Sequence, residues 1–593
     1  MLPYRAPTQN FEFLLRDVFD MESFWAGMQG TAHFTVDDAL AIYEEAARFV
    51  TNTLLPLNRS GDEQGCRLDD DGVKTPEGWA EAYHQYSANG WQGMPASPEY
   101  GGQGFPKTLS LGAEEMLMTV NPSFALYHFL TAGTIVLLNE HANECIRNTY
   151  LPPLAQGRWV GTMCMTEAQC GTDLGLIKTR AEAMVDGTYR ITGSKIFISG
   201  GDHDMAENHC HLVLAKLPDA PAGSRGISLF IVPKFIPDTD GAAGQRNAVN
   251  VGSIEKKMGM KANATCVMNF DGATGWLINA PNRGLASMFT MMNYERLVCG
   301  LQGLGAGIAS YQGALAYAKE RRQGRAPVGV RDPEQDADPI LVFADVRRTL
   351  LEMKAFTEGG RALCYYTAMQ LDTCKFSADP AAKQLAQDLC DLLTPVVKVY
   401  LSDRGYHYAG EGQQLYGGHG FIREYGMEQV VRDCRIARLY EGANGVIATD
   451  LTKRKIVGSK GKLTELLAGE VRNFVDGLAD NSAAAAYREE FLQLTAKVEA
   501  VNAALVSRAP DAPDLVGAVA TPVCHLFGLW ALAYMWIRMA DAAGKTNQDS
   551  DFVAGKLKTA SFFFSFCVPE ADLLVTRFNA GCDIPMSLSE TQF

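Results

Sequence analysis

The spacing of apolar residues divides the 593-residue chain into successive regions. Up to about residue 160, apolar positions recur every three or four residues, as in Asp37 to Leu55, and this spacing predicts helices. From about 160 to 285 the chain carries short alternating runs such as YRITGSKIFISGG and GISLFIVPKF, separated by Gly, Pro, Asp and Asn, which predict strands. Helical spacing returns from about 285 to 455.

A further helical region is predicted beyond residue 461. It follows KRKIVGSKGKL, a basic and glycine-containing segment that we interpret as a linker. Within it, AAAAYREEFLQLTAKVEAVNAALVSR has the pattern of an amphipathic helix. We therefore expect an α+β protein with domains at 1–160, 161–285, 286–460 and 461–593.

Composition indicates a soluble globular protein, with 47% hydrophobic and 20% charged residues. The net charge of -15 disfavours nucleic acid as the main partner, because phosphate would be repelled over most of the surface. An acidic coenzyme held in a locally basic cleft stays compatible with this charge.

Three patterns bear on location and metals. The 14 cysteines form no CxxC pair and the N-terminus lacks a secretory pattern, so we expect reduced thiols and a cytoplasmic location. Val523 to Ala540 approaches the length of a membrane span, but His525 and Arg538 favour a buried helix. His203, His209 and His211 have no acidic or histidine partner at ligand spacing, so we expect no metal site.

Candidate chemistry is concentrated between Gln413 and Asp450. Gly417 and Gly418 allow backbone to approach a ligand, and Glu441 lies between Tyr440 and Gly442. The intervening EYGMEQVVRDCRIARLY has helical spacing, which predicts a glycine turn, a helix and a second turn that carries an acid. An isolated Glu-Gly pair is more often a surface acid, so further motifs have to support a catalytic role.

The order of these segments resembles the acyl-CoA dehydrogenase family, in which a QxxGGxGF turn precedes a Y-E-G turn. Four further segments fit the resemblance: MCMTEAQCGTD resembles T-E-x-x-x-G-S-D, KIFISGG resembles K-x-W-I-T-N-G, ERRQGR resembles E-R-x-x-F-G, and NYERLV resembles the start of a family helix. The joint occurrence of these segments in a fixed order is the specific part of the resemblance.

The resemblance implies a helical N-terminal domain, a central β-barrel or sandwich and a C-terminal four-helix bundle, here followed by the extra helical domain of long bacterial members. It also implies FAD as cofactor and acyl-CoA as substrate. The residues expected to contact FAD are Met163, Met165, Thr166, Thr172, Phe197, Ser199, Arg321, Gln414, Gly417 and Gly418. Those expected near the substrate are Arg296, Tyr440 and Gly442, although Arg296 beside Glu295 also fits a solvated charge.

Glu441 is expected to act as the base that removes the α-proton, with flavin N5 accepting the hydride from Cβ. Burial beside ligand would raise the pKa of the carboxyl towards that of the substrate α-proton. The chain has Ala443 and Gly445 where the family commonly has threonine and glutamine, so we expect backbone, Asn444 or water to replace those flavin contacts.

The resemblance also implies an electron-transfer flavoprotein as acceptor and a homodimer, with Gln414, Gly417 and Gly418 reaching the FAD of the neighbouring subunit. The N-terminus and the extra domain resemble a subgroup that includes enzymes for 3-(methylthio)propanoyl-CoA, of dimethylsulfoniopropionate demethylation, and broad-specificity fatty acyl enzymes. We take the thioether substrate as first choice; Met288, Met291 and Met292 suit either a thioether pocket or core packing. Alternatives are a fatty acyl-CoA dehydrogenase, an acyl-CoA oxidase and a flavin-containing DNA-binding protein, the last disfavoured by the acidic C-terminal region.

Overall fold

The computed structural model describes residues 2–593, which divide into two compact units. Unit 1 comprises the residues up to Ala47, Lys107–Thr119 and Cys299–Phe593. Unit 2 comprises Arg48–Pro106 and Val120–Val298. The long helix α9 (Gly284–Glu320) begins in unit 2 and ends in unit 1.

Unit 2 combines four helices with the strands. The helices are α4 (Leu55–Gln64), α5 (Trp79–Ala88), α7 (Pro122–His141) and α8 (Glu144–Ala155). The strands are β1 (Arg67–Asp69), β2 (Gly72–Lys74), β3 (Trp159–Cys164), β4 (Arg180–Ala183), β5 (Tyr189–Ser199), β6 (Asn208–Lys216), β7 (Ile227–Pro233), β8 (Phe235–Pro237), β9 (Ala243–Arg246), β10 (Val249–Ile254) and β11 (Thr265–Ile278).

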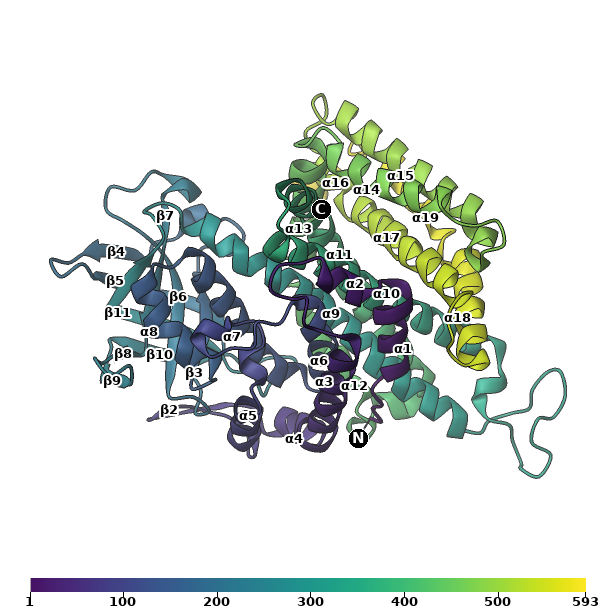
Figure 1. The fold of residues 1–593 in the computed structure, drawn as a ribbon, viewed down its shortest axis with the longest axis horizontal. Helices are drawn as coiled ribbons and strands as arrows, with labels where there is room; N and C mark the ends of the chain where they lie inside the picture. Colours follow the sequence, from purple (N-terminus) through teal and green to yellow (C-terminus); the bar gives the residue numbers. More distant parts are fainter. Residues whose placement is uncertain (1) are drawn as a thin grey trace. The chain divides into compact units, whose positions relative to one another are not determined.

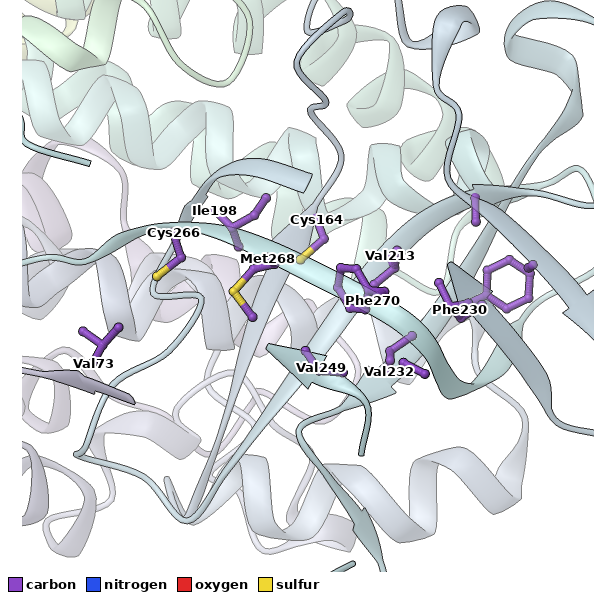
Figure 2. Close-up of a cluster of buried hydrophobic side chains, with 14 of the residues drawn as sticks. Val73, Cys164, Ile198, Val213, Phe230, Val232, Val249, Cys266, Met268 and Phe270 are labelled. Atoms are coloured by element: carbon purple, nitrogen blue, oxygen red, sulfur yellow. The ribbon is translucent and has the colours of Figure 1, made fainter. Parts of the chain in front are cut away.

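The main sheet of unit 2 closes on itself. Strand β11 pairs with β5 through most of its length and with β7 near its end, while β7 pairs with β6, β6 with β4 and β4 with β5. Strand β3 adds parallel to β6, and β10 adds to β11. Figure 2 shows the apolar side chains gathered between these strands, including Val213, Phe230, Val232, Met268 and Phe270. The ring of strands confirms the predicted central β-domain and, of the two expected forms, barrel or sandwich, it is a barrel.

The named secondary-structure elements of unit 1 are helices. Its helices, besides the end of α9, are α1 (Thr8–Phe13), α2 (Met21–Ala26), α3 (Val36–Phe49), α6 (Lys107–Val120), α10 (Ala344–Phe376), α11 (Pro380–Leu415), α12 (Met427–Cys434), α13 (Asn444–Asp450), α14 (Lys462–Asp476), α15 (Arg488–Arg508), α16 (Leu515–Ala518), α17 (Ala520–Ala543), α18 (Ser550–Phe562) and α19 (Glu570–Asn579). The amphipathic helix predicted from Ala483 begins at Arg488, after a short 3-10 turn.

Small residues let the long helices of unit 1 pack at close range. A Cβ on Gly303 of α9 would lie 2.2 Å from the carbonyl oxygen of Leu401 on α11, and one on Gly405 would lie 2.0 Å from that of Gly303. Both distances are shorter than any van der Waals contact. The α9–α11 crossing therefore requires glycine at both positions, and α11 is held firmly against α9.

The C-terminal region packs on these helices as part of unit 1. Figure 1 shows the yellow-green α17 between α11 and α15, and it contacts α10, α11 and α15. The 18-residue window of α17 that is apolar enough to cross a membrane is 83% buried, as predicted for a core helix. The window in Ser550–Asn579 passes the same test of length and hydropathy and is 33% buried. A buried ion pair of 2.9 Å joins Lys556 on α18 to Glu358 on α10.

The segment interpreted as a linker is mostly helical. Residues Leu451–Val457 continue α13 as a π-helix, and Lys455 pairs with Asp391 of α11 at 2.5 Å. Lys455 therefore contributes to packing in unit 1, and the predicted linker is helical up to Val457.

Candidate active-site residues

Glu441 lies on a tight turn between two short helical segments of unit 1. A 3-10 turn, Arg435–Arg438, precedes it and α13 follows. Glu441 has a φ of 54° and Gly442 a φ of 85°, so two consecutive residues adopt the left-handed conformation. A left-handed residue other than glycine costs about 1–3 kcal/mol and persists only where its surroundings impose it. The backbone at the candidate base is therefore held in place by neighbouring groups.

A buried lysine on α11 supports this turn. Lys398, fully buried, donates from Nζ to the carbonyl oxygen of Gly442 at 2.8 Å and to Oδ1 of Asn444 at 2.5 Å. The amide nitrogen of Asn444 donates in turn to Ser402 at 2.9 Å. Both polar atoms of the Asn444 side chain thus have partners on α11, which disfavours the alternative that this side chain replaces the missing flavin contacts.

Tyr440 anchors the other side of the turn. Its hydroxyl donates to Oε1 of Gln302 on α9 at 2.6 Å, and Gln302 is buried. The turn is thus attached to two long helices, α9 through Tyr440 and α11 through Gly442. The attachment fixes the backbone from which the Glu441 carboxylate projects.

The glycine turn that follows α11 is a 3-10 segment, Gly417–Phe421. Tyr317 of α9 fixes it: its ring stacks on Tyr416 with centroids 4.1 Å apart, and its hydroxyl lies 2.9 Å from Nδ1 of His419. Gly417 and Gly418 are exposed, and a Cβ at either would meet no atom within 4 Å. The backbone of this turn and the Gln414 side chain are therefore accessible to a ligand.

Arg321 follows the last residue of α9. The neighbouring arginines have partners within unit 1. Arg322 forms an ion pair with Asp332 at 2.7 Å, and Arg325 donates to the carbonyl of Asp332 at 3.0 Å. The Arg321 side chain is exposed and makes no hydrogen bond or ion pair with any residue in 2–593. A free, exposed guanidinium suits the predicted phosphate contact.

Phe197 marks a distortion of the barrel in unit 2. The pairing of β5 with β11 shifts register between Lys195 and Ile198, and Phe197 in this bulge has a φ of 60°. The residue is 59% exposed although it belongs to a strand of the barrel. A β-bulge re-aims a side chain, and here it turns an aromatic ring out of the barrel, where it can flank a planar ligand.

The segment Met163 to Thr172 is bound to the same bulge. Ile196 donates its N–H to the carbonyl of Thr166 at 2.9 Å, and Lys195 donates to the carbonyl of Met165 at 3.0 Å. The hydroxyls of Thr166 and Ser199 have no hydrogen-bond partner within the described chain. Unit 2 therefore brings the two predicted flavin segments together and leaves their hydroxyls available. Thr172 is exposed at the end of the first segment.

A buried ion pair between Glu167 and Lys195 stabilises the contact between the two predicted flavin segments. The two side chains, 4% and 0% exposed, form an ion pair of 2.8 Å, and Glu167 also accepts from the Thr179 hydroxyl at 2.6 Å. Burial alone would raise the pKa of Glu167, but the Lys195 ammonium and these hydrogen bonds outweigh it and lower the pKa to about 2. The glutamate of the T-E motif thus has a structural role.

Arg296 is buried in unit 2, which contradicts the solvated alternative. It is 5% exposed and Glu295 is 2% exposed, and the Arg296 guanidinium lies 6.0 Å from the centre of the Phe289 ring. Buried charged residues are costly unless they have specific partners, so neither residue is a solvated surface charge.

The three histidines are also buried, and they form a cluster. His209 and His211 lie on β6 with their rings 6.4 Å apart, and His203 packs against His209. Burial lowers the pKa of His203 to about 4 and that of His211 to about 3, so both are neutral. Residues 2–593 contain no group of three or more His, Cys, Asp or Glu side chains arranged to hold a metal ion.

Sequence reasoning missed Lys398, Gln302 and Ser402, the residues that support the Glu441 turn. Lys398 has a signal in the sequence, because it is a single charge inside the apolar run LLTPVVKVYL. A lone lysine at a buried helical position needs a specific acceptor. Its partner, a backbone carbonyl more than 40 residues away, has no signature.

Family models match most of the chain. They are the acyl-CoA dehydrogenase N-terminal domain at residues 37–158, the middle domain at 162–273, the C-terminal domain at 282–456, and an acetyl-CoA dehydrogenase C-terminal-like domain at 467–589.

Individual relatives cover almost the whole length. The chain is 38% identical to the 3-methylmercaptopropionyl-CoA dehydrogenase of Ruegeria pomeroyi, over 95% of both chains. It is 31% identical to the broad-specificity linear acyl-CoA dehydrogenase FadE5 of Mycobacterium tuberculosis, over 96% of both. Its fold resembles that of an acyl-CoA dehydrogenase from Bacillus anthracis solved with FAD, with a TM-score of 0.76, 20% identity, and coverage of 98% of this chain and 93% of that one.

Proposed function

This chain belongs to the acyl-CoA dehydrogenase family, and we propose that it removes hydrogen from Cα and Cβ of an acyl-CoA thioester with Glu441 as the base. The family depends on FAD, so FAD is the cofactor of this chain. The observation that carries the proposal is the Glu441 turn, a left-handed glutamate supported by a buried lysine.

The chain's own residues fit FAD. In unit 2, the outward Phe197 side chain and the free hydroxyls of Thr166 and Ser199 suit contact with a flavin. In unit 1, the free guanidinium of Arg321 suits contact with a pyrophosphate. The exposed backbone of Gly417 would approach the cofactor of a second subunit. When bound, FAD supplies the acceptor for the hydride that leaves Cβ.

Glu441 would take the α-proton onto its carboxylate. Its backbone N–H would donate to the thioester carbonyl, which stabilises the negative charge that develops there as the proton leaves. Loss of the α-proton and of the β-hydride leaves a double bond between Cα and Cβ. Tyr440 and Lys398 would keep the carboxylate in position by holding the backbone on either side.

The substrate we propose is 3-(methylthio)propanoyl-CoA, with its 3-(methylthio)acryloyl thioester as product. The proposal rests on the 38% identity to the Ruegeria enzyme. A linear fatty acyl-CoA is the second candidate, favoured by the 31% identity to FadE5. Met288 and Met291 do not decide between them, because both are 0% exposed, which favours core packing.

Anaerobic titration of the purified flavoprotein separates these candidates. Methylthiopropionyl-, butyryl-, octanoyl- and palmitoyl-CoA are added in parallel while flavin absorbance is followed. We expect fastest bleaching with the thioether substrate; faster bleaching by a fatty acyl-CoA would move the substrate to the second candidate. Absence of bleaching with all four would refute the activity.

The electron acceptor and assembly are further parts of the proposal. We expect an electron-transfer flavoprotein as acceptor, a cytoplasmic location and a homodimer. Exposed apolar side chains around the two candidate turns, Phe421, Ile422, Leu439 and Val446, support association with another subunit. Fast reoxidation of the reduced protein by air with release of peroxide would instead indicate an acyl-CoA oxidase. Sedimentation of the holoenzyme as a monomer would exclude the dimer.

A further inference from the structure

One carboxylate connects the Glu441 turn to the C-terminal region. Asp403 on α11 accepts at Oδ1 from Arg438 Nε at 2.5 Å and from Asn444 Nδ2 at 2.9 Å. Its other oxygen, Oδ2, lies 2.8 Å from Nε2 of His525 on α17. Arg438 precedes Glu441 by three residues and Asn444 follows it by three. Asp403 therefore holds both ends of the turn while His525 holds Asp403.

His525 is a polar residue on a helix that is otherwise apolar over most of its length. Its side chain is 19% exposed, and its ring meets Tyr400 edge-on with centroids 5.8 Å apart. A polar ring in such surroundings is costly unless it makes a hydrogen bond, and Asp403 is the hydrogen-bond partner that the structure provides. The pair places α17, from the extra C-terminal helical region, in direct contact with the support of the turn.

Asp403 is ionised in this arrangement. Burial would raise the pKa of this carboxyl, but the hydrogen bonds from His525 and Asn444 and the charge of Arg438 hold it below its usual value. A charged acceptor makes stronger hydrogen bonds than a neutral one. Together with Lys398, Asp403 gives the turn two supports on α11, one at the Gly442 carbonyl and one at its flanks.

We propose that His525 is a positioning residue for Glu441 and acts through Asp403. The left-handed conformation of Glu441 is unfavourable by itself, so the carboxylate keeps its position only while the flanking residues are held. The C-terminal region therefore takes part in proton abstraction, although none of its residues needs to touch the substrate. This inference rests on the proposed function, because it assumes that Glu441 is the base.

The test measures proton transfer without flavin reduction. An acyl-CoA with sulfur in place of Cβ can lose its α-proton but cannot become an enoyl thioester, so incorporation of deuterium at Cα in D2O reports the base alone. Exchange is measured on the full-length holoenzyme at saturating analogue for His525→Leu, which removes the hydrogen bond, and for His525→Gln, whose amide nitrogen can replace Nε2. Tyr534→Phe is the matched control, because it removes a 3.0 Å hydrogen bond to Glu470 from the same helix.

We expect His525→Leu to incorporate deuterium at Cα about tenfold more slowly than the parent. This loss of rate is smaller than the roughly 100-fold loss that displacement of a reacting group by 1 Å can cause. His525→Gln should stay within about twofold of the parent. The dissociation constant of the analogue, FAD content and the Tyr534→Phe rate should not change. Parental exchange in His525→Leu overturns the proposal. The proposal is also overturned if both His525 variants lose exchange equally and also lose FAD, because that result indicates a structural role.

Two further variants keep the result interpretable. If His525→Leu does not fold, Asp403→Asn takes its place, since it keeps the volume and removes the charge; we expect the same loss, and parental exchange overturns the proposal. Glu441→Gln should abolish exchange. If it does not, the assignment of the base fails, whatever the His525 variants show.

Discussion

The Glu441 turn and the Phe197 bulge place a left-handed, non-glycine residue at a candidate site, but by different means. In unit 2 the register shift between β5 and β11 imposes the conformation of Phe197 through main-chain pairing. In unit 1 the side chains of Lys398, Asn444 and Tyr440 hold the turn. Strain set by a sheet ladder is local, whereas strain held by side chains depends on distant residues. Single substitutions should therefore disturb Glu441 far more easily than Phe197.

The largest effect should come from Glu441→Gln. The amide keeps the shape of the side chain but cannot accept the α-proton, so flavin bleaching should slow by about 10³-fold or more. FAD content and the affinity for acyl-CoA, measured by spectral titration, should match the parent. Bleaching at a near-normal rate would mean that another residue is the base.

Lys398→Met removes one support of the turn and leaves Glu441 in place. The bleaching rate at saturating substrate should fall by about 100-fold, as expected when a reacting group moves by about 1 Å. Lys455→Met is the control, because it removes a lysine from a different contact with α11, the pair with Asp391. A parental rate in Lys398→Met would show that the turn keeps its geometry without the lysine.

Arg321→Ala tests whether the free guanidinium of Arg321 contacts a phosphate of FAD. Loss of a charged hydrogen bond to phosphate should weaken FAD binding by about tenfold, measured as flavin retained on dialysis. Arg322→Ala removes an arginine already paired with Asp332 and should retain flavin like the parent. Full occupancy in Arg321→Ala would count against the phosphate contact.

Phe197→Gly tests whether the left-handed backbone at the bulge in unit 2 is strained and whether the aromatic ring contacts FAD. Glycine adopts a φ of 60° without strain, so the free energy of unfolding of the apoprotein should rise by about 1 kcal/mol. The rise is measured as a higher melting temperature. Loss of the aromatic contact should weaken FAD binding by about fivefold. Phe197→Ala should show the weaker binding without the gain in stability. A stability gain from alanine equal to that from glycine would argue against strain at this position.

The smallest effect concerns acid stability. Because the pKa of Glu167 is about 2 in the folded protein and 4.5 in its ordinary state, its stabilising contribution is complete above pH 4.5 and is lost as the pH falls towards 2. Between pH 7 and pH 4 the loss should be about 1 kcal/mol. Denaturant unfolding at both values, with Glu167→Gln as reference, should show a weaker pH dependence in the variant. An unchanged dependence would exclude Glu167 as its source.

Motif reasoning identified the candidate segments whose residues are consecutive in the chain. The glycine turn, the acid before Gly442 and the two segments that meet at Phe197 were all identified from short stretches, and the structure shows Gly417 open and Phe197 turned outward. It failed where a partner is remote. Nothing in the sequence placed Asn444 against α11 or brought His525 to Asp403. The domain boundaries and the roles of the individual site residues stay predictions.

The sequence alone determined the order of helical and stranded regions and the family, because periodicity and adjacent motifs are local properties of the chain. The closure of the sheet into a barrel appeared only in the strand pairing. Only the tertiary structure decided what holds Glu441. The α9–α11 crossing at Gly303 and Gly405 and the packing of α17 bring Lys398, Asp403 and His525 to the turn from positions far apart in the sequence. Hydrogen bonds between such residues depend on ångström-scale positions, which no spacing rule specifies.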